Sequence, residues 1–195
     1  MVVRKIAQLG EPVLRKRARE LSPDELASPH IVTLIEDLIE TMRDADGAGL
    51  AAPQVYESVA LVVIEVRANP RYPNVEQIPL TVLVNPKLTP ILGASGDSLQ
   101  DGDAIEVYEG CLSVTGLRGR VRRPRKVRVQ ALDRSGRPID EVWEGFRAAV
   151  VQHETDHLLG TLFLDRADPS TLTFLREYER YVPPEKRVVD TGAQA

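Results

Sequence analysis

Apolar residues recur at helical spacing in the segment that begins at Ser28-Pro29. Ser28 offers a capping hydroxyl, and Pro29 suits the first position of a helix. Five apolar residues then fall on one helical face: Ile31, Leu34, Ile35, Leu38 and Met42. This stripe predicts an amphipathic helix over residues 29–43, which the polar, glycine-containing stretch 44–49 ends.

Short runs rich in β-branched residues predict strands elsewhere. The run 59–66 is typical of a strand buried on both faces. A strand over 80–84 is expected to end at Asn85-Pro86. Further strands are expected at 104–107, 112–114, 126–132 and 139–143, with a hairpin turn at 133–136.

Two polar segments interrupt this pattern. Residues 68–79 and 93–103 contain proline or glycine and are predicted to be surface insertions. A short helix is expected from Pro169 to Glu179. Because no repeat or linker divides the chain, we expect a single domain over 1–182 and a flexible tail over 183–195.

The segment 145–159 predicts a different kind of helix. Its apolar residues lie on nearly all sides, which is typical of a buried helix. Its last part nevertheless carries the ionisable residues His153, Glu154, Asp156 and His157. Burial of such groups costs several kcal/mol unless partners or a metal compensate. The functional site is therefore expected on this helix.

Residues 153–157 form an H-E-x-x-H motif. Helical i, i+4 spacing lets His153 and His157 reach one metal ion, with Glu154 placed to accept a proton from water. The chance expectation for this motif in a chain of this composition is on the order of 0.004. A metal site is therefore favoured over two histidines held by hydrogen bonds alone.

A catalytic site needs a third ligand and an open coordination position. The metzincin pattern would require a histidine at position 163, where this chain has Phe163. Glu177 lies at a spacing tolerable for a thermolysin-like protease. Cys111, flanked by Gly110, is the other candidate, as a thiolate ligand.

Composition excludes several classes of protein. The 195 residues carry 25 Lys+Arg and 29 Asp+Glu, and the net charge of −4 argues against nucleic-acid binding through overall charge. The longest purely apolar run, 59–64, is far shorter than the roughly 20 residues that span a membrane. The first residues lack a secretory signal pattern, and the lone cysteine excludes an internal disulfide. We therefore expect a cytoplasmic protein.

Three segments together resemble the signature motifs of the peptide deformylase family. They are residues 47–54 (GAGLAAPQ), 109–113 (EGCLS) and 152–157 (QHETDH), in the family's order and at compatible spacing. The similarity extends over most of residues 8–166. We expect an α+β fold in which short, mainly antiparallel strands form small sheets around a central helix that carries the H-E-x-x-H motif.

The resemblance implies a function and a ligand set. Members of the family remove the formyl group from the N-terminal formyl-methionine of new polypeptides. By resemblance, Cys111, His153 and His157 bind one divalent metal, Fe²⁺ in most members, with Zn²⁺, Ni²⁺ or Co²⁺ able to occupy the same ligands. Glu154 then transfers the proton, and the Gln54 amide and the Leu112 backbone N–H hold the developing oxyanion.

Residues around these ligands are predicted to bind the substrate. Val107, Phe146, Ala149 and Val150 are candidates for the wall of an apolar slot for the methionine side chain. The resemblance also places two motif glycines and their neighbours along the substrate: Ala48, Gly49, Glu109 and Gly110. Ala48 is smaller than the branched residue common in the family, and Tyr56-Glu57 stands where many members have glycine.

The expected partners are formyl-methionyl peptides and nascent chains, with a transient ribosome contact and no membrane or specific nucleic-acid sequence. The basic stretch 118–128 is interpreted as a solvated strand edge rather than an RNA contact. Arg118 or Arg123 is expected to neutralise a buried Glu109 or Asp156. The alternatives are a metallopeptidase that uses Glu177 and a non-catalytic metal-binding module.

Overall fold

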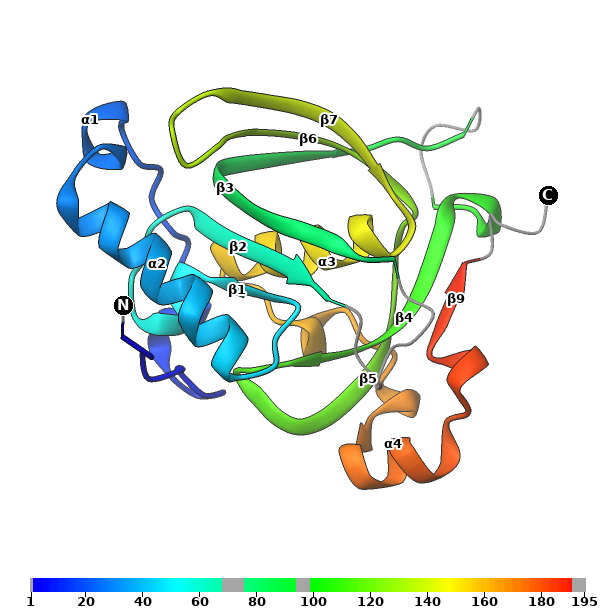
Figure 1. The fold of residues 1–195 in the computed structure, drawn as a ribbon. Coiled ribbons are helices and arrows are strands. Elements are labelled where there is room, and N and C mark those ends of the chain that lie inside the picture. Colours follow the sequence, from blue (N-terminus) through cyan, green and yellow to red (C-terminus); the bar gives the residue numbers. More distant parts are fainter. Residues whose placement is uncertain (1, 68–75, 94–98, 191–195) are drawn as a thin grey trace.

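The computed structural model describes residues 2–67, 76–93 and 99–190. In these ranges the strands form two antiparallel sheets, and helices pack on both faces of the larger sheet (Figure 1). The predicted α+β class with mainly antiparallel strands is therefore confirmed. No helix within the described ranges has the length and apolar character needed to cross a membrane.

The larger sheet has the strand order β1-β2-β3-β6-β7. Its strands are β1 (Gly49–Ala51), β2 (Leu61–Val66), β3 (Ile78–Pro90), β6 (Lys126–Leu132) and β7 (Pro138–Glu144). The smaller sheet has the order β8-β5-β4-β9. Its strands are β4 (Ala104–Cys111), β5 (Val114–Pro124), β8 (Thr173–Phe174) and β9 (Val188–Asp190).

Four α-helices lie within the described ranges: α1 (Pro23–Leu26), α2 (Pro29–Asp44), α3 (Gly145–Leu158) and α4 (Leu175–Tyr181). Short 3₁₀ helices lie at Pro12–Arg15, Ala52–Val55, Asp101–Asp103, Phe163–Asp165, Pro169–Thr171 and Pro184–Lys186.

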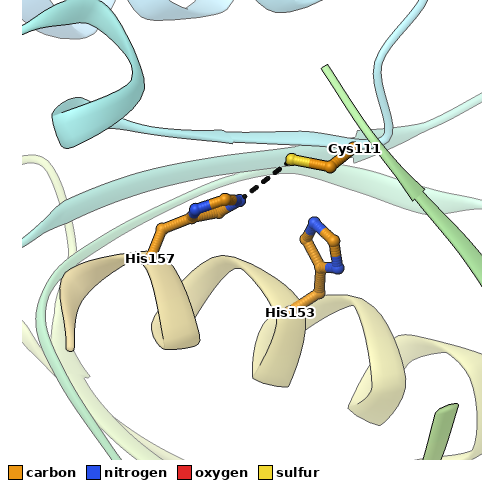
Figure 2. A group of neighbouring side chains, drawn as sticks. All are labelled: Cys111, His153 and His157. Carbon is orange, nitrogen blue, oxygen red and sulfur yellow. Dashed lines mark hydrogen bonds between the residues drawn. The ribbon is translucent and has the colours of Figure 1, made fainter. Parts of the chain in front are cut away.

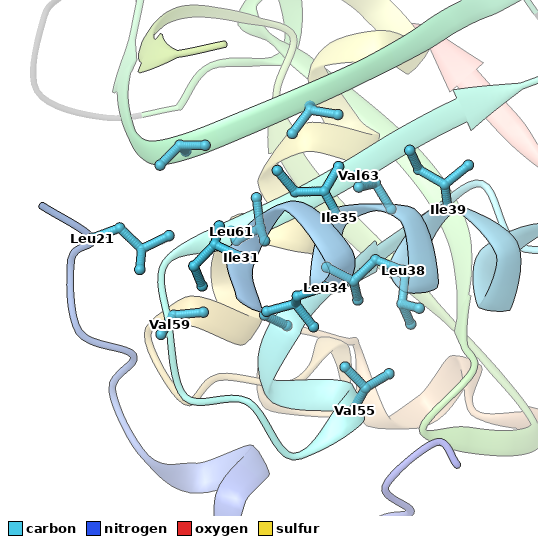
Figure 3. Packing of buried hydrophobic residues seen from close by; sticks show 14 of the residues in the cluster. Leu21, Ile31, Leu34, Ile35, Leu38, Ile39, Val55, Val59, Leu61 and Val63 are labelled. Atoms are coloured by element: carbon cyan, nitrogen blue, oxygen red, sulfur yellow. The ribbon is translucent and has the colours of Figure 1, made fainter. Parts of the chain in front are cut away.

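Helix α2 covers one face of the larger sheet. The Ser28 hydroxyl accepts a hydrogen bond from the Ile31 N–H at 3.3 Å, as expected for an N-cap. The five residues of the predicted stripe are all buried and pack against Leu61 and Val63 of β2 (Figure 3). The amphipathic helix predicted over 29–43 is therefore confirmed.

Helix α3 covers the opposite face. Val62 and Ile64, which alternate with the α2-facing residues of β2, pack in one cluster with Ala148 and Val151 of α3. The helix also contacts β4 and β5 of the smaller sheet. It therefore lies where the two sheets meet, and residues from both can converge on its surface.

Two features of the larger sheet differ from prediction. The stretch 49–51, where the sequence predicts no strand, forms β1 and pairs with β2. Asn85-Pro86 does not end β3, because Asn85 adopts a positive φ of 52° and the register shifts there as a bulge. The Asn85 amide stabilises the bulge through hydrogen bonds to the Leu21 N–H and C=O, at 2.9 and 2.8 Å.

The strand predicted at 112–114 is wrong. Cys111 pairs with Val114, so Leu112 and Ser113 form the turn of a tight hairpin between β4 and β5. At Arg118, where the basic stretch begins, β5 is also not a free strand edge, because β8 pairs with it on the side opposite β4. Its side chains alternate instead, with Arg122 exposed and Arg123 buried.

The C-terminal part differs from prediction as well. A 3₁₀ helix and β8 occupy the start of the helix expected from Pro169, and α4 begins only at Leu175. Residues 188–190, expected in a flexible tail, form β9 and pair with the edge of β4. Residues 68–75, 94–98 and 191–195 of the predicted insertions and tail lie outside the described residues.

Candidate metal centre and its cleft

His153 and His157 lie one turn apart on α3. Their ring centroids are 5.2 Å apart and the rings are nearly perpendicular. The helix ends at Leu158, and Gly160 follows two residues later with a φ of 73°, which suits glycine. A Cβ there would also lie 2.8 Å from the carbonyl carbon of Arg15, so this position fixes how α3 meets the N-terminal segment.

Cys111 reaches the two histidines from the end of β4. Its Sγ lies 3.3 Å from His157 Nε2, and the candidate ligand atoms of Cys111, His153 and His157 all lie within 4.8 Å of one another (Figure 2). All three residues are buried. Tetrahedral coordination at bond lengths of about 2.0–2.3 Å separates ligand atoms by about 3.5 Å, so this donor set fits one metal ion.

A carboxylate orients one of the imidazoles. Glu109 Oε2 lies 2.7 Å from His153 Nδ1, which leaves the Nε2 of that ring for the metal. Burial opposes ionisation of Glu109, but its ion pair with Arg123 outweighs burial and lowers the pKa of Glu109 to about 2. Glu109 is therefore a carboxylate, which accepts the His153 N–H.

The imidazoles differ in their affinity for protons. Burial lowers the pKa of His157 well below its usual value. Burial also opposes a proton on His153, but the hydrogen bonds to Cys111 and Glu109 outweigh it and hold the pKa of His153 well above its usual value. The groups around His153 thus stabilise positive charge, as a cation site requires.

Arg123 joins Glu109 of β4 to Asp156 of α3. Its Nη2 donates to Glu109 Oε2 and its Nη1 to Asp156 Oδ2, both at 2.9 Å. Arg166 also pairs with Asp156, through two hydrogen bonds of 2.7 Å. Of the two arginines proposed as partners, Arg123 therefore serves both buried carboxylates. Arg118 instead donates to the Leu117 carbonyl and lies against Gly110.

Glu154 lies beside the ligands, on α3. Burial raises the pKa of this carboxyl to about 7. Its Oε2 is buried and has no hydrogen-bond partner among the described residues. Gly49 of β1 passes so close that a Cβ on it would lie 2.5 Å from Glu154 Oε1. Glycine at 49 therefore makes room for the carboxylate.

Gln54 and the β4–β5 turn complete the centre. The Ala51 N–H donates to Gln54 Oε1 at 2.8 Å, which turns the amide Nε2 toward Ser113 Oγ at 3.1 Å and Cys111 Sγ at 3.5 Å. The Ser113 N–H also points to Cys111 Sγ, at 3.4 Å. Two N–H groups therefore point at the Cys111 sulfur, one from the Gln54 amide and one from the Ser113 backbone.

A cleft of about 680 Å³ opens onto this centre. Cys111, His153, Glu154, Gln54 and Leu112 line it. So do all eight residues predicted to bind substrate: Ala48, Gly49, Val107, Glu109, Gly110, Phe146, Ala149 and Val150. His157, which is 1% exposed, does not line the cleft and lies beneath it.

The comparisons with known proteins agree with this geometry. Residues 3–172 match the family model described as polypeptide deformylase. The chain belongs to the polypeptide deformylase family. Peptide deformylase from Leptospira biflexa is 43% identical over 173 residues, which cover 88% of this chain and 92% of that protein. Peptide deformylase 1 from Prochlorococcus marinus is 43% identical over 181 residues, which cover 92% of this chain and 88% of that protein.

Solved deformylase structures share the fold. The class I type b peptide deformylase from Acinetobacter baumannii with Met-Ala-Ser bound has a TM-score of 0.76 and 37% identity, and the match covers 85% of this chain and 98% of that one. A peptide deformylase from Legionella pneumophila has a TM-score of 0.70 and 39% identity, and the match covers 87% of this chain and 89% of that one.

Family membership weighs against the Glu177 alternative. Among the described residues, the group able to hold a metal consists of Cys111, His153 and His157. Glu177 lies on α4, which packs against β5 and β8. The metallopeptidase ligand set is therefore absent from the described part of this deformylase.

Sequence reasoning missed the supporting roles of Ser113 and Arg166. Ser113 is fully buried, and its place in the segment 109–113, two residues after Cys111, is the signal that could have indicated its role. Arg166 lies eight residues after the end of α3, and the turn at Gly160 brings it back to Asp156. No local sequence pattern predicts this contact between Arg166 and Asp156.

Proposed function

We propose that this protein hydrolyses the formyl group from the N-terminal formyl-methionine of newly synthesised polypeptides. Water adds to the formyl carbon, the C–N bond breaks, and formate and a free amine are released. One observation carries the proposal: a thiol and two imidazoles converge beside a buried carboxylate at the floor of a cleft. The Met-Ala-Ser peptide bound to the Acinetobacter relative supports a peptide substrate.

Cys111, His153 and His157 would hold one divalent ion, which the family resemblance suggests is Fe²⁺, with Zn²⁺, Ni²⁺ or Co²⁺ as substitutes. When bound, the ion supplies Lewis-acid chemistry, since it polarises a carbonyl and lowers the pKa of water. Glu109 would fix the ring of His153 for this purpose.

Glu154 would carry the proton. Its carboxylate lies next to the ligand residue His153, lines the cleft and has a free oxygen. It can therefore accept a proton from the attacking water and deliver it to the departing amine. The close approach of Gly49 limits where this carboxylate can move.

Gln54 Nε2 and the Leu112 N–H would stabilise the oxyanion that develops on the formyl group. Both residues line the cleft beside Cys111, and Gln54 is held by Ala51 and Ser113. Fixed donors of this kind are each worth roughly 3 kcal/mol in a transition state.

The methionine side chain would occupy an apolar slot lined by Val107, Phe146, Ala149 and Val150. Val107 and Ala149 are almost fully buried, at 6% and 3% exposure, so the slot has a firm wall. Ala48, Gly49, Glu109 and Gly110 would lie along the substrate backbone. A cytoplasmic location, a catalytic domain over 1–182 and a transient ribosome contact complete the proposal.

Formate release from a formyl-methionyl peptide tests this function. Protein purified without oxygen should release formate. Glu154→Ala should retain its metal and lose activity by about 10²- to 10⁴-fold. Unchanged biological activity of that variant would favour a non-catalytic metal-binding module. An inactive wild type with full metal occupancy would contradict the assignment.

A further inference from the structure

The edge of β4 next to the cleft is covered by the last described strand. Strand β9 lies beside β4 (Figure 1). Val107 of β4 pairs with Val188 of β9, and the Tyr108 N–H donates to the Arg187 carbonyl at 2.9 Å. The Arg187 guanidinium lies over the Tyr178 ring at 5.0 Å. Strand β9 is thus anchored to α4 as well as to β4.

The two valines of β9 face opposite sides of the sheet. Paired residues of antiparallel strands place their side chains on the same face. Val188 therefore shares the face of Val107 and packs on the cluster formed by Ile105, Val107 and Ala149, next to Phe146. Val189 pairs with Glu106 and lines a separate hollow of about 430 Å³ on the other face.

Val188 lies behind the wall of the proposed methionine slot. Val107, Phe146 and Ala149 line the cleft, whereas Val188 does not. Val188 is partly buried and packs against the apolar cluster of Ile105, Val107 and Ala149, as Phe146 also does. Because interiors are close-packed, the volume of a side chain behind a wall fixes where the wall residues lie.

We propose that Val188 is a positioning residue that sets the width of the methionine slot and thereby the preference for methionine as the first residue. This inference rests on the proposed function. Removing two methyl groups in Val188→Ala leaves a void into which Val107 and Phe146 can relax. A slot that relaxes in this way discriminates less between side chains of different size.

The test compares Val188→Ala with Val189→Ala, a matched change on the opposite face of the same strand. Formate release is measured with formyl-Met-Ala-Ser and formyl-Ala-Ala-Ser. For Val188→Ala we expect the ratio of the two kcat/KM values to fall about five-fold, through a higher KM for the methionine peptide with kcat nearly unchanged. Val189→Ala should keep the wild-type ratio.

A second measurement tests the width of the slot by peptide binding, without catalysis. Binding of the product peptides Met-Ala-Ser and Ala-Ala-Ser, measured by calorimetry, should show the same loss of preference in Val188→Ala. If Val188→Ala does not fold, Val188→Ile replaces it, and the added methylene should also lower the ratio by narrowing the slot. Unchanged ratios in a folded Val188 variant, with an active wild type, would overturn this inference alone. A wild type that releases no formate from either peptide would overturn it together with the proposed function.

Discussion

At the scale of single residues, the centre depends on contacts that hold the candidate ligands in place. Glu109 orients His153 and is itself held by Arg123. Gly49 provides space for Glu154. Neither Glu109 nor Gly49 carries out the proposed chemistry, yet each fixes the position of a side chain that does.

Glu109→Gln tests the support of His153. The substitution removes the charge that pairs with Arg123 and weakens the acceptor for His153 Nδ1. Loss of such a support typically lowers metal affinity by about 10- to 100-fold. Competition with a chelator measures the affinity. Glu106→Gln, three residues away on the opposite face of β4, is the control and should bind metal as the wild type does. Equal affinity in both variants would contradict the role of Glu109.

Gly49→Ala tests the space beside Glu154. The new Cβ would lie 2.5 Å from Oε1, so the carboxylate has to move. A displacement of about 1 Å can lower the rate of formate release by about 100-fold. Metal content should stay at the wild-type level. Gly102→Ala is the control, because a Cβ there meets nothing within 4 Å. Full activity of Gly49→Ala would show that Glu154 does not depend on this space.

At the scale of elements, the side chains of the candidate site come from three separate segments. Helix α3 provides both histidines and Glu154, while the end of β4 provides Cys111. The 3₁₀ helix over Ala52–Val55 presents Gln54, and Tyr56 ends it with a φ of 67°, a left-handed conformation that costs roughly 1–2 kcal/mol for a residue with a side chain.

Tyr56→Gly should relieve this strain. We expect the free energy of unfolding to rise by about 0.5–1 kcal/mol, since the lost hydrogen bond from the Tyr56 hydroxyl to Glu11 is exposed. Denaturant unfolding measures the change. Tyr56→Ala removes the same ring and keeps the strain, so it should not stabilise the protein. Equal effects of the two substitutions would argue against strain at this position.

An ion pair joins α2 to β2 at the rim of the cleft. Hydrogen bonds from Arg43, at 2.7 and 3.1 Å, and from Arg67 lower the pKa of Glu65. Because the pKa is lower in the folded state, this stabilisation is complete above the usual pKa of about 4.5 and is lost as pH falls through the folded value. The unfolding free energy of the wild type should therefore exceed that of Glu65→Gln by up to about 1 kcal/mol at pH 7. A difference that does not shrink in acid would contradict this assignment.

At the scale of the whole molecule, the site forms because α3 lies between two sheets that come from distant parts of the chain. The sequence predicts α2 from its apolar spacing and capped start, and α3 from a segment that is apolar on nearly all sides, because both are local signals. It also predicts that Cys111 meets His153 and His157, through motif resemblance rather than periodicity. It does not predict β1 or β9, because three-residue strands depend on a neighbouring edge, nor the bulge at Asn85, which depends on contacts with Leu21.

The convergence of one thiol and two imidazoles on a single ion is the central claim, and X-ray absorption spectroscopy of the zinc-loaded protein tests it most directly. The spectrum should show one sulfur at about 2.3 Å and two imidazole nitrogens at about 2.0–2.1 Å, and the sulfur should disappear in Cys111→Ser. A wild-type spectrum that contains only nitrogen and oxygen ligands would contradict the claim.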